Sequence, residues 1–594
     1  MASVKLAVYV TAHTVRKIAR GELDLAAARR LLDKLGIEKV YIENYRFGLL
    51  VGRDELEAAV SAFRGYEVAG GSCIGTWGEG WGRYADFGFK VVCLTDERNL
   101  KLIEEAMEGA GEVFDEILID DFWANWCACQ HCVERFNEEY GLDVTPQLLR
   151  AELRRGASPL AALWARFSTE LLLEVSRRHV VEPFKRHSSS ARVVLKVAEW
   201  REDFYVRGLF IPALREVFDG VYVGTESRER VHRYGSYYTA RLVAALAGGL
   251  GGAWFDTYDG LGYTFPVTPE TYIEQLVASA ASLPPEITLF NLEDLLKPSR
   301  EPHVRALERH LPDMREFLRR VSGEPIGVLR PAILPHFSPA RDRYVEDYLG
   351  SVGLPLRPVT PREIGEGDYV LITAKEVELL DLEELVRRVG TLILTADALE
   401  LIADRYARVA KLLGLEKVER REAWATTFRY GDRWTWEGHR RAVRLPVGPI
   451  IRCRGAEPVV WAGDGSEEWP VVLRRRSGGL GVVMMCVTKC PGLLLEYPEP
   501  VRQALRDIAA EYTGVRVAAR VGPLSNVSIY LYSDGHLLVM NHNSYSLVIE
   551  VDYRKARFSG KPRVVGGQAK LGELAEEMFL LELPGRSYGI IECA

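Results

Sequence analysis

The sequence is poor in amide side chains, has no basic excess and contains no long uncharged apolar run. No stretch approaches the roughly 18 apolar residues that span a bilayer, and the short apolar run at the N-terminus lacks a basic leader. We therefore expect a cytoplasmic protein with no membrane partner. The 76 Lys and Arg residues against 83 Asp and Glu give a net charge of −7, which argues against nucleic acid as a partner. Five Gln and eight Asn in 594 residues, beside abundant charge, suggest a thermophilic source.

The first half of the chain repeats one pattern, in which a short β-branched run follows a helical stretch and ends in polar or aromatic residues. Eight such runs occur, over 5–13, 38–47, 66–75, 115–123, 191–200, 219–226, 252–260 and 286–294. Apolar residues at helical spacing lie between them. Eight alternating β and α units predict an α/β fold of the (β/α)8, or TIM-barrel, type, with its chemistry at the carboxyl ends of the strands.

The remaining chain changes character twice. Apolar runs alternate with helices up to about residue 515, which predicts a smaller parallel α/β domain. The last segment has period-2 runs separated by turn residues, with one helix-like stretch among them, and predicts a small antiparallel β domain. The expected domains are 1–322, 323–515 and 516–594.

Five of the nine cysteines lie in the first quarter of the chain. Cys127, Cys129 and Cys132 form a C-x-C-x-x-C cluster just after the fourth expected strand. With either Cys93 or Cys73 as the fourth ligand, four thiolates would make a closed structural zinc site. The alternative is a set of reduced thiols without metal.

Acidic residues end most of the eight strands. They are Glu43, Asp120, Asp121, Glu199, Glu226, Asp256, Asp259 and Glu293. Singly, each is best explained as a hydrogen-bonded loop residue, but many carboxylates around one barrel mouth raise one another's pKa and indicate use.

Aromatic residues lie near the same strand ends. They include Trp77, Trp123, Trp126, Trp200, Trp254 and Tyr258. An aromatic face suits the C–H face of a sugar ring. Carboxylate pairs beside aromatic platforms indicate glycoside hydrolysis, in which one acid protonates the leaving oxygen and a second carboxylate attacks or activates water.

The segment IDDFWANWCACQHCVERFNEEYG resembles the segment after strand four in glycoside hydrolase family 42 β-galactosidases, where a catalytic acid precedes a C-x-C-x-x-C zinc cluster. FKVVCLTDERN is similar to the family segment that bears the fourth zinc cysteine, which favours Cys93. The three-part domain order also resembles that family. The resemblance implies a flavodoxin-like, amidotransferase-related middle domain that forms a trimer. Ala396 and Asp397 stand there where an amidotransferase would carry its nucleophilic cysteine, so we expect that domain to be catalytically silent.

By position, the resemblance places Asp121 at the family's acid/base, Asp120 at the preceding asparagine and Glu226 at the nucleophile. Glu226 follows the sixth expected strand rather than the seventh. Carboxylates on strands four and six look instead like the α-galactosidase type of barrel, in which the strand-four Asp is the nucleophile. The two carboxylates are the same in both alignments, but their roles are exchanged.

We therefore predict a glycoside hydrolase, galactosidase-like and exo-acting, with Asp121 and Glu226 as the catalytic pair and Asp120 beside them. The predicted substrate-binding residues are Glu43, Trp77, Trp123, Glu199, Trp200, Asp256 and Tyr258. Structural zinc is the expected cofactor and carbohydrate the expected substrate. The alternatives are a zinc-dependent hydrolase on the same barrel and a carbohydrate-binding barrel without turnover.

Overall fold

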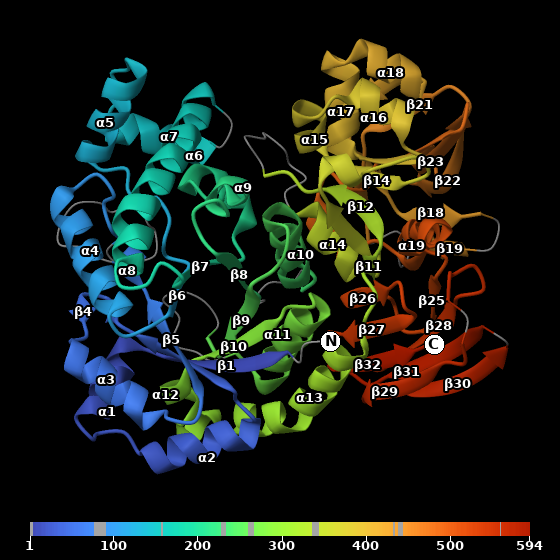
Figure 1. Cartoon of the computed structure of the whole chain (residues 1–594). Helices are drawn as coiled ribbons and strands as arrows, with labels where there is room; N and C mark the ends of the chain where they lie inside the picture. The colour runs from blue at the N-terminus through green and yellow to red at the C-terminus, as the bar shows by residue number, and fades with distance from the viewer. Residues whose placement is uncertain are drawn as a thin grey trace. The chain divides into compact units, whose positions relative to one another are not determined.

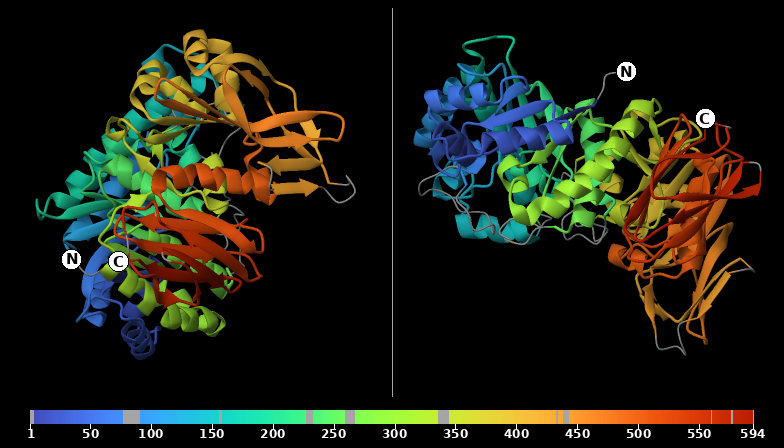
Figure 2. Two further views of the ribbon diagram at one scale, coloured as in Figure 1. Left: turned by 90° about the vertical axis from the view of Figure 1, so that its right-hand side faces the viewer. Right: turned by 90° about the horizontal axis from the view of Figure 1, so that it is seen from below.

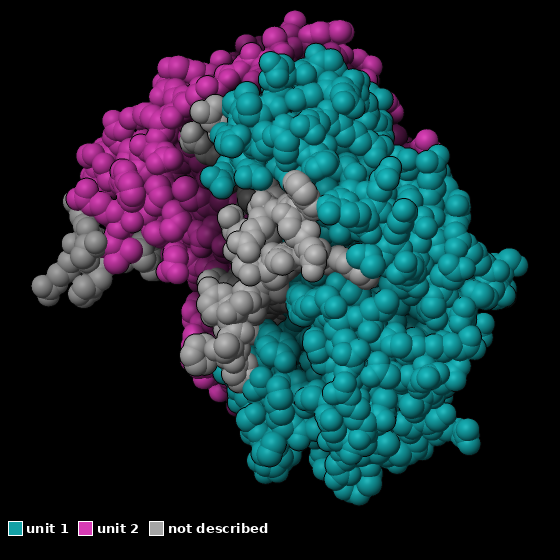
Figure 3. Space-filling model, turned by 90° about the vertical axis from the view of Figure 1, so that its left-hand side faces the viewer, with its two compact units in different colours: residues 1–229, 239–319, 334–337 teal, residues 230–238, 320–333, 338–594 magenta. Residues whose placement is uncertain are grey.

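The computed structural model describes residues 4–76, 91–155, 158–226, 233–258, 267–334, 344–431, 434–437, 443–558, 560–575 and 577–593. The chain forms two compact units (Figures 1 and 3). Unit 1 comprises Met1–Glu229, Thr239–Arg319 and Leu334–Phe337, and unit 2 comprises Arg230–Tyr238, Arg320–Ile333 and Ser338–Ala594. The three-domain boundaries drawn from the sequence stay a prediction.

Unit 1 contains a closed barrel of parallel strands, ordered β1-β2-β5-β6-β7-β8-β9-β10 around the ring. Within the described residues the barrel strands are β1 (Lys5–Val10), β2 (Lys39–Glu43), β5 (Glu67–Ser72), β6 (Glu116–Ile119), β7 (Arg192–Val197), β8 (Gly220–Gly224), β9 (Gly252–Asp256) and β10 (Glu286–Phe290). Each lies inside one of the eight predicted runs, so the TIM-barrel prediction is confirmed. A short hairpin, β3 (Tyr45–Arg46) and β4 (Leu49–Leu50), follows β2.

Helices connect the barrel strands, and a further long helix, α13 (Glu301–Arg320), follows the last of them. The longer connecting helices are α1 (Ala12–Ala19), α2 (Leu25–Leu35), α3 (Arg53–Ala62), α4 (Glu97–Gly111), α5 (Gln130–Tyr140), α6 (Pro146–Arg155), α7 (Pro159–Val175), α10 (Gly235–Ala247) and α11 (Pro269–Ala281). Local sequence explains their ends. The Asp24 side chain accepts a hydrogen bond from Ala27 N to cap α2, and Gly36 ends that helix at a φ of +64°.

The barrel interior is filled by alternate residues of each strand. Ala7, Tyr9, Tyr41, Ala69, Leu118, Val194, Tyr222 and Trp254 form one buried cluster. Successive side chains of a strand point to opposite faces, so residues two positions further along, toward the carboxyl ends, also point inward. This parity decides which side chains meet above the core.

The amino-terminal end of the barrel holds a buried ion network. The Lys39 side chain is 5% exposed, and its Nζ lies 2.5 Å from Glu116 Oε1 and 3.1 Å from Glu286 Oε2. Tyr41 and Tyr222 donate hydrogen bonds of 2.6 and 2.8 Å to Glu286 Oε1. Burial acts to lower the pKa of Lys39, but Glu286 and Glu116 outweigh it and raise that pKa, so the Lys39 ammonium is charged at neutral pH.

Unit 2 contains a nine-stranded mixed sheet. Its strands, in spatial order, are β13 (Leu356–Val359), β12 (Val328–Pro331), β14 (Tyr369–Ile372), β15 (Thr391–Thr395), β24 (Leu480–Met485), β23 (Glu468–Ser477), β22 (Ala456–Gly463), β18 (Thr427–Tyr430) and β19 (Trp434–Glu437). The first five are parallel in the 2-1-3-4-5 order of flavodoxin-like sheets, as predicted. The four antiparallel strands that extend the sheet were not predicted.

Unit 2 also contains two larger antiparallel sheets, besides the two-stranded pairs of β16 (Leu415–Glu419) with β21 (Ile450–Cys453) and of β17 (Ala423–Ala425) with β20 (Leu445–Val447). One has the order β11-β26-β27-β32-β29 and the other β25-β28-β31-β30. Their bounds are β11 (Pro325–Ile326), β25 (Arg516–Val521), β26 (Val527–Tyr532), β27 (His536–Asn541), β28 (Leu547–Asp552), β29 (Arg563–Gly567), β30 (Lys570–Ala575), β31 (Met578–Leu583) and β32 (Ser587–Glu592). Both contribute to one hydrophobic core and lie against each other, in red, in Figure 2.

The sequence interpretation of this region needs two corrections. The run expected as one strand over 325–331 divides, so that β11 pairs with β26 and β12 joins the large sheet. The helix-like stretch expected among the last strands forms β29 and β30, since pairing with β32 and β31 overrides local helix propensity.

Among the helices of the described residues, none combines the length and apolarity that crossing a membrane requires.

Replacing Lys39 with Met should destabilise the barrel by about 3–5 kcal/mol, because Glu286 would stay buried without its cation, although Glu116 keeps a second partner in Arg192. Thermal unfolding measures the effect. Lys5→Met is the matched control, since Lys5 and its partner Glu67 are both about half exposed and such a pair contributes roughly 0–1 kcal/mol. Equal losses for the two variants would contradict this account.

Candidate active site

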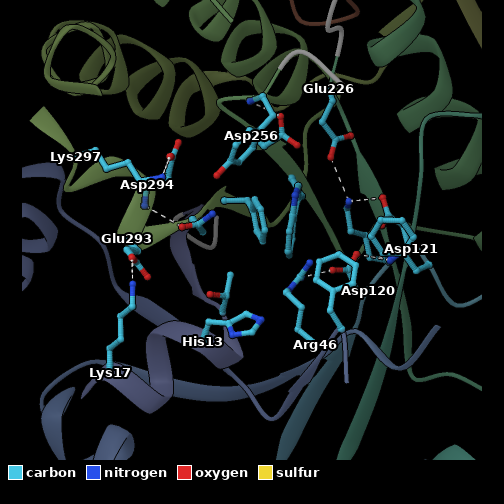
Figure 4. A pocket seen from close by; sticks show the side chains of 18 of the residues that line it. His13, Lys17, Arg46, Asp120, Asp121, Glu226, Asp256, Glu293, Asp294 and Lys297 are labelled. Atoms are coloured by element: carbon cyan, nitrogen blue, oxygen red, sulfur yellow. Dashed lines mark hydrogen bonds and ion pairs between the residues drawn. The ribbon is translucent and has the colours of Figure 1, made fainter. Parts of the chain in front are cut away.

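A cavity of about 490 Å³ opens at the carboxyl ends of the barrel strands (Figure 4). Its ionisable lining residues are His13, Lys17, Arg46, Asp120, Asp121, Lys196, Glu226, Asp256, Glu293, Asp294 and Lys297. They lie at or beyond the ends of seven of the eight strands, which is where TIM barrels carry their chemistry.

Strand parity brings several of these side chains inward. In β7, Val194 belongs to the barrel core, and Lys196 lies two positions further on. In β8, Tyr222 belongs to the same core and Glu226 lies four positions beyond it. A Cβ at Gly224 would lie 2.1 Å from Glu226 Oε2, so only glycine leaves room for the Glu226 side chain there.

Lys196 joins the two predicted catalytic carboxylates. Its Nζ lies 2.6 Å from Asp121 Oδ2 and 3.2 Å from Glu226 Oε1, so these two oxygens are at most 5.8 Å apart. All three side chains are buried. The pKa of Lys196 is raised, because Asp121 and Glu226 outweigh the lowering by burial, and the ammonium stays charged. Its nitrogen also lies 4.5 Å from the centroid of the Trp254 ring.

Asp120 and Asp121 are neighbours with opposite pKa shifts. Burial, together with the adjacent charge of Asp120, raises the pKa of Asp121 to about 7 against the opposing effect of Lys196. Burial also acts to raise the pKa of Asp120, but hydrogen bonding with Asp121 and the charges of Arg46 and Lys196 hold it below its usual value. Asp120 is therefore ionised at neutral pH, while Asp121 exchanges its proton near pH 7.

Arg46 is the second buried cation of the site. Its Nη2 donates a 2.7 Å hydrogen bond to Asp120 Oδ2, and its Nε donates to both oxygens of Glu43 at 3.0 and 2.8 Å. Glu43 also accepts hydrogen bonds from the Tyr9 hydroxyl and from Ala12 N. Glu43 thus holds Arg46 in place and does not line the cavity.

Further paired charges and aromatic rings line the same cavity. Lys17 pairs with Glu293, and Lys297 Nζ lies 2.8 Å from Asp294 Oδ1 (Figure 4). The Trp254 and Phe290 rings stack with centroids 5.0 Å apart. Hydrogen-bonding groups around apolar ring faces are what a sugar requires.

The predicted binding residues divide into three groups. Trp200, Asp256 and Tyr258 line the cavity. Glu43, Glu199 and Trp123 do not line it. The Trp123 prediction is corrected, because the indole Nε1 donates a 2.9 Å hydrogen bond to Ser176 Oγ and the ring is fully buried. Trp77 lies outside the described residues.

Lys196, Arg46 and Phe47 line the cavity but were not predicted. For Lys196 a signal existed, because it is a charged residue at an inward-facing position of the apolar run RVVLKV. Arg46 and Phe47 follow the second strand in the short hairpin, whose path the sequence pattern did not reveal.

The four predicted zinc ligands converge. The Sγ atoms of Cys93, Cys127, Cys129 and Cys132 all lie within 4.8 Å of one another. Cys93 Sγ is 3.6 Å from Cys129 Sγ and 3.5 Å from Cys132 Sγ, and the latter two are 3.9 Å apart. Cys73 lies elsewhere, near Glu43 and Asp120, so the structure selects Cys93 as the fourth member.

Comparisons with known proteins agree with this geometry. The family described as "probable glycosyl hydrolase, catalytic domain" matches residues 1–310, and the second and third domains of the uncharacterized protein SSO3021 match 323–490 and 493–576. SSO3021 of Saccharolobus solfataricus is 37% identical over 610 residues, covering 100% of this chain and 99% of that protein.

Two solved structures share the fold over the whole chain. The β-galactosidase of Bacillus circulans sp. alkalophilus is 13% identical, with a TM-score of 0.63 and coverage of 100% of this chain and 99% of that one. The α-L-fucosidase isoenzyme 2 of Paenibacillus thiaminolyticus is 10% identical, with a TM-score of 0.64 and full coverage of both chains. At these identities the likeness shows a common fold. The chain belongs to the family of the probable glycosyl hydrolase catalytic domain, and it is a glycoside hydrolase.

Proposed function

We propose that this protein is a retaining, galactosidase-like exo-glycosidase whose catalytic pair is Asp121 and Glu226. The observation that carries the proposal is that one buried ammonium, Lys196, contacts both carboxylates at the wall of a single cavity. The resulting limit of 5.8 Å between their nearest oxygens fits the roughly 5–5.5 Å separation of retaining enzymes better than the roughly 6.5–9.5 Å of inverting enzymes.

The electrostatics assign the roles. A general acid needs a pKa near the working pH, and the pKa of Asp121 is about 7. Glu226 would attack the anomeric carbon while the Asp121 proton passes to the leaving oxygen. In the second step the Asp121 carboxylate would take a proton from water, whose oxygen displaces Glu226 from the sugar.

A panel of aryl glycosides tests the substrate class. The two fold relatives are named for a galactoside and a fucoside, so β-galactosides and α-L-fucosides should be tried first, followed by the opposite anomers and by glucosides, mannosides and arabinosides. Turnover of one sugar and anomer supports the proposal, and NMR of the first product formed shows whether its anomeric configuration is retained. An inverted product would contradict the assigned mechanism.

Asp121→Asn and Glu226→Gln should each lower kcat by at least about 10²-fold with the thermal midpoint largely kept, because each removes one half of the acid–nucleophile pair.

Azide distinguishes the roles of Asp121 and Glu226. With Asp121→Ala, azide should capture the glycosyl-enzyme and give a product of retained configuration, whereas with Glu226→Ala it should attack the sugar directly and give inversion. The reverse result would exchange the two roles.

The pH profile tests Lys196. Because the Lys196 charge lowers the pKa of Asp121, Lys196→Met should raise that pKa above about 7 and move the alkaline limb of kcat/KM to higher pH. Lys196→Arg keeps the charge and should move the limb much less. If the limb stays in place in Lys196→Met, Asp121 is not the group that must be protonated.

We also propose that Cys93, Cys127, Cys129 and Cys132 hold a structural zinc ion. Sulfurs at about 2.3 Å from a tetrahedral zinc lie about 3.8 Å apart, and three of the sulfur–sulfur distances in the structure are 3.5, 3.6 and 3.9 Å. Such an ion would brace the loop that follows Asp121. Because none of these cysteines lines the cavity, their placement favours carboxylate chemistry over the zinc-dependent alternative.

Purified protein should therefore carry about one zinc per chain by elemental analysis, and a strong chelator or Cys129→Ser should lower the thermal midpoint. Cys73→Ser is the matched control and should keep the zinc, since Cys73 lies outside the cluster. Loss of turnover on chelation with the midpoint unchanged would show that zinc acts in catalysis instead.

A further inference from the structure

Phe47 is a strained, exposed aromatic residue at the catalytic cavity. It occupies the two-residue turn of the β3–β4 hairpin, with φ values of +50° at Phe47 and +86° at Gly48. Turns of this kind favour Asn or Gly at both positions, and an aromatic residue with positive φ is strained. Its side chain is 50% exposed and lines the cavity. The sequence thus has a conformationally strained residue at a position where Asn or Gly would form the same turn without strain.

The Phe47 ring is held against a rigid support. The Arg46 guanidinium lies 5.5 Å from the ring centroid, and Arg46 is itself fixed by Glu43 and Asp120. Gly48 N donates a 2.8 Å hydrogen bond to the Tyr45 hydroxyl, which closes the turn. A ring held in advance of binding loses little conformational entropy when a ligand stacks on it.

The contacts also show on which side of the cavity the ring stands. Phe47 packs on Arg46, Arg46 bonds Asp120, and Asp121 N bonds Asp120 Oδ1 (Figure 4 shows the last three residues). The ring therefore lies on the side of Asp121, the assigned acid. The acid of a glycosidase faces the leaving group, because it must protonate the oxygen of the breaking bond.

We infer that Phe47 is the platform of a leaving-group subsite, on which the apolar face of the departing sugar stacks. The inference rests on the proposed function and extends it: the substrate has a second ring beyond the bond that is cleaved. On this inference the backbone strain at Phe47 persists because the turn places the ring where the ligand binds. Strained backbone conformations commonly occur at binding sites.

The test compares two substrates that share a donor sugar. Lactose has a sugar leaving group, whereas β-galactosyl fluoride has none to stack; if the panel selects fucose, a fucosyl disaccharide and α-L-fucosyl fluoride replace them. Phe47→Ala should lower the ratio of kcat/KM for the disaccharide to kcat/KM for the fluoride about tenfold, and Phe47→Trp should keep it. Leu50→Ala is the matched control, because Leu50 is an exposed apolar residue of the same hairpin that does not line the cavity.

Phe47→Asn separates binding from folding. Asn tolerates positive φ, so this variant should have a higher thermal midpoint than the wild type and the same loss in substrate ratio as Phe47→Ala. An unchanged ratio in both variants overturns the inference while the proposed function stands. If the wild-type protein turns over no glycoside of the panel and neither fluoride, the proposed function fails and the subsite fails with it.

Discussion

The site depends on one buried contact, that of the Lys196 ammonium with Asp121 and Glu226. Two carboxylates in a low-dielectric wall repel each other, and each is costly to bury without a partner. A single cation between them offsets part of both penalties and holds the two carboxylates close together. It stands there because β7 lies between β6, which Asp121 follows, and β8, which Glu226 follows. The catalytic spacing therefore depends on the order of the strands in the closed barrel.

Arg46 is a second buried cation that pairs with two carboxylates, those of Glu43 and Asp120. Two cations, Arg46 and Lys196, face four buried carboxylates, namely Glu43, Asp120, Asp121 and Glu226. This imbalance favours one shared proton. The proton resides on Asp121, because Asp120 has the better ionic partners and its pKa is held low. Arg46 thus acts on the acid indirectly, by keeping Asp120 charged beside it.

Much of this arrangement could be predicted from local pattern. Eight β–α repeats predicted the barrel, and an acidic residue at a strand end predicted a place at its mouth, which is how Asp121, Glu226 and Asp256 were found. Where the chain leaves a strand, parity no longer applies. Trp123, three residues beyond Asp120, turns to a partner 53 positions away, Ser176, and no local signal marks such a contact. Lys196 was not predicted for a different reason. A lysine in a strand is usually expected to face solvent, and its burial follows only from the complete barrel.

The segment that carries the acid links the chemistry to the rest of the barrel. Asp120 N donates to Ser72 O of β5, Asn125 N donates to Arg207 O, and the Asn125 amide donates to Ser168 Oγ of α7. The cysteine cluster follows at once, with α5 beginning directly after Cys129. Asp121 is therefore anchored before and after by bonds to distant parts of the barrel. A residue whose pKa is set by burial needs such anchoring, because a small outward movement would hydrate the carboxyl group and return its pKa toward the ordinary value. The thiol cluster and the buried amide contacts thus serve the acid, even though none of them touches the cavity.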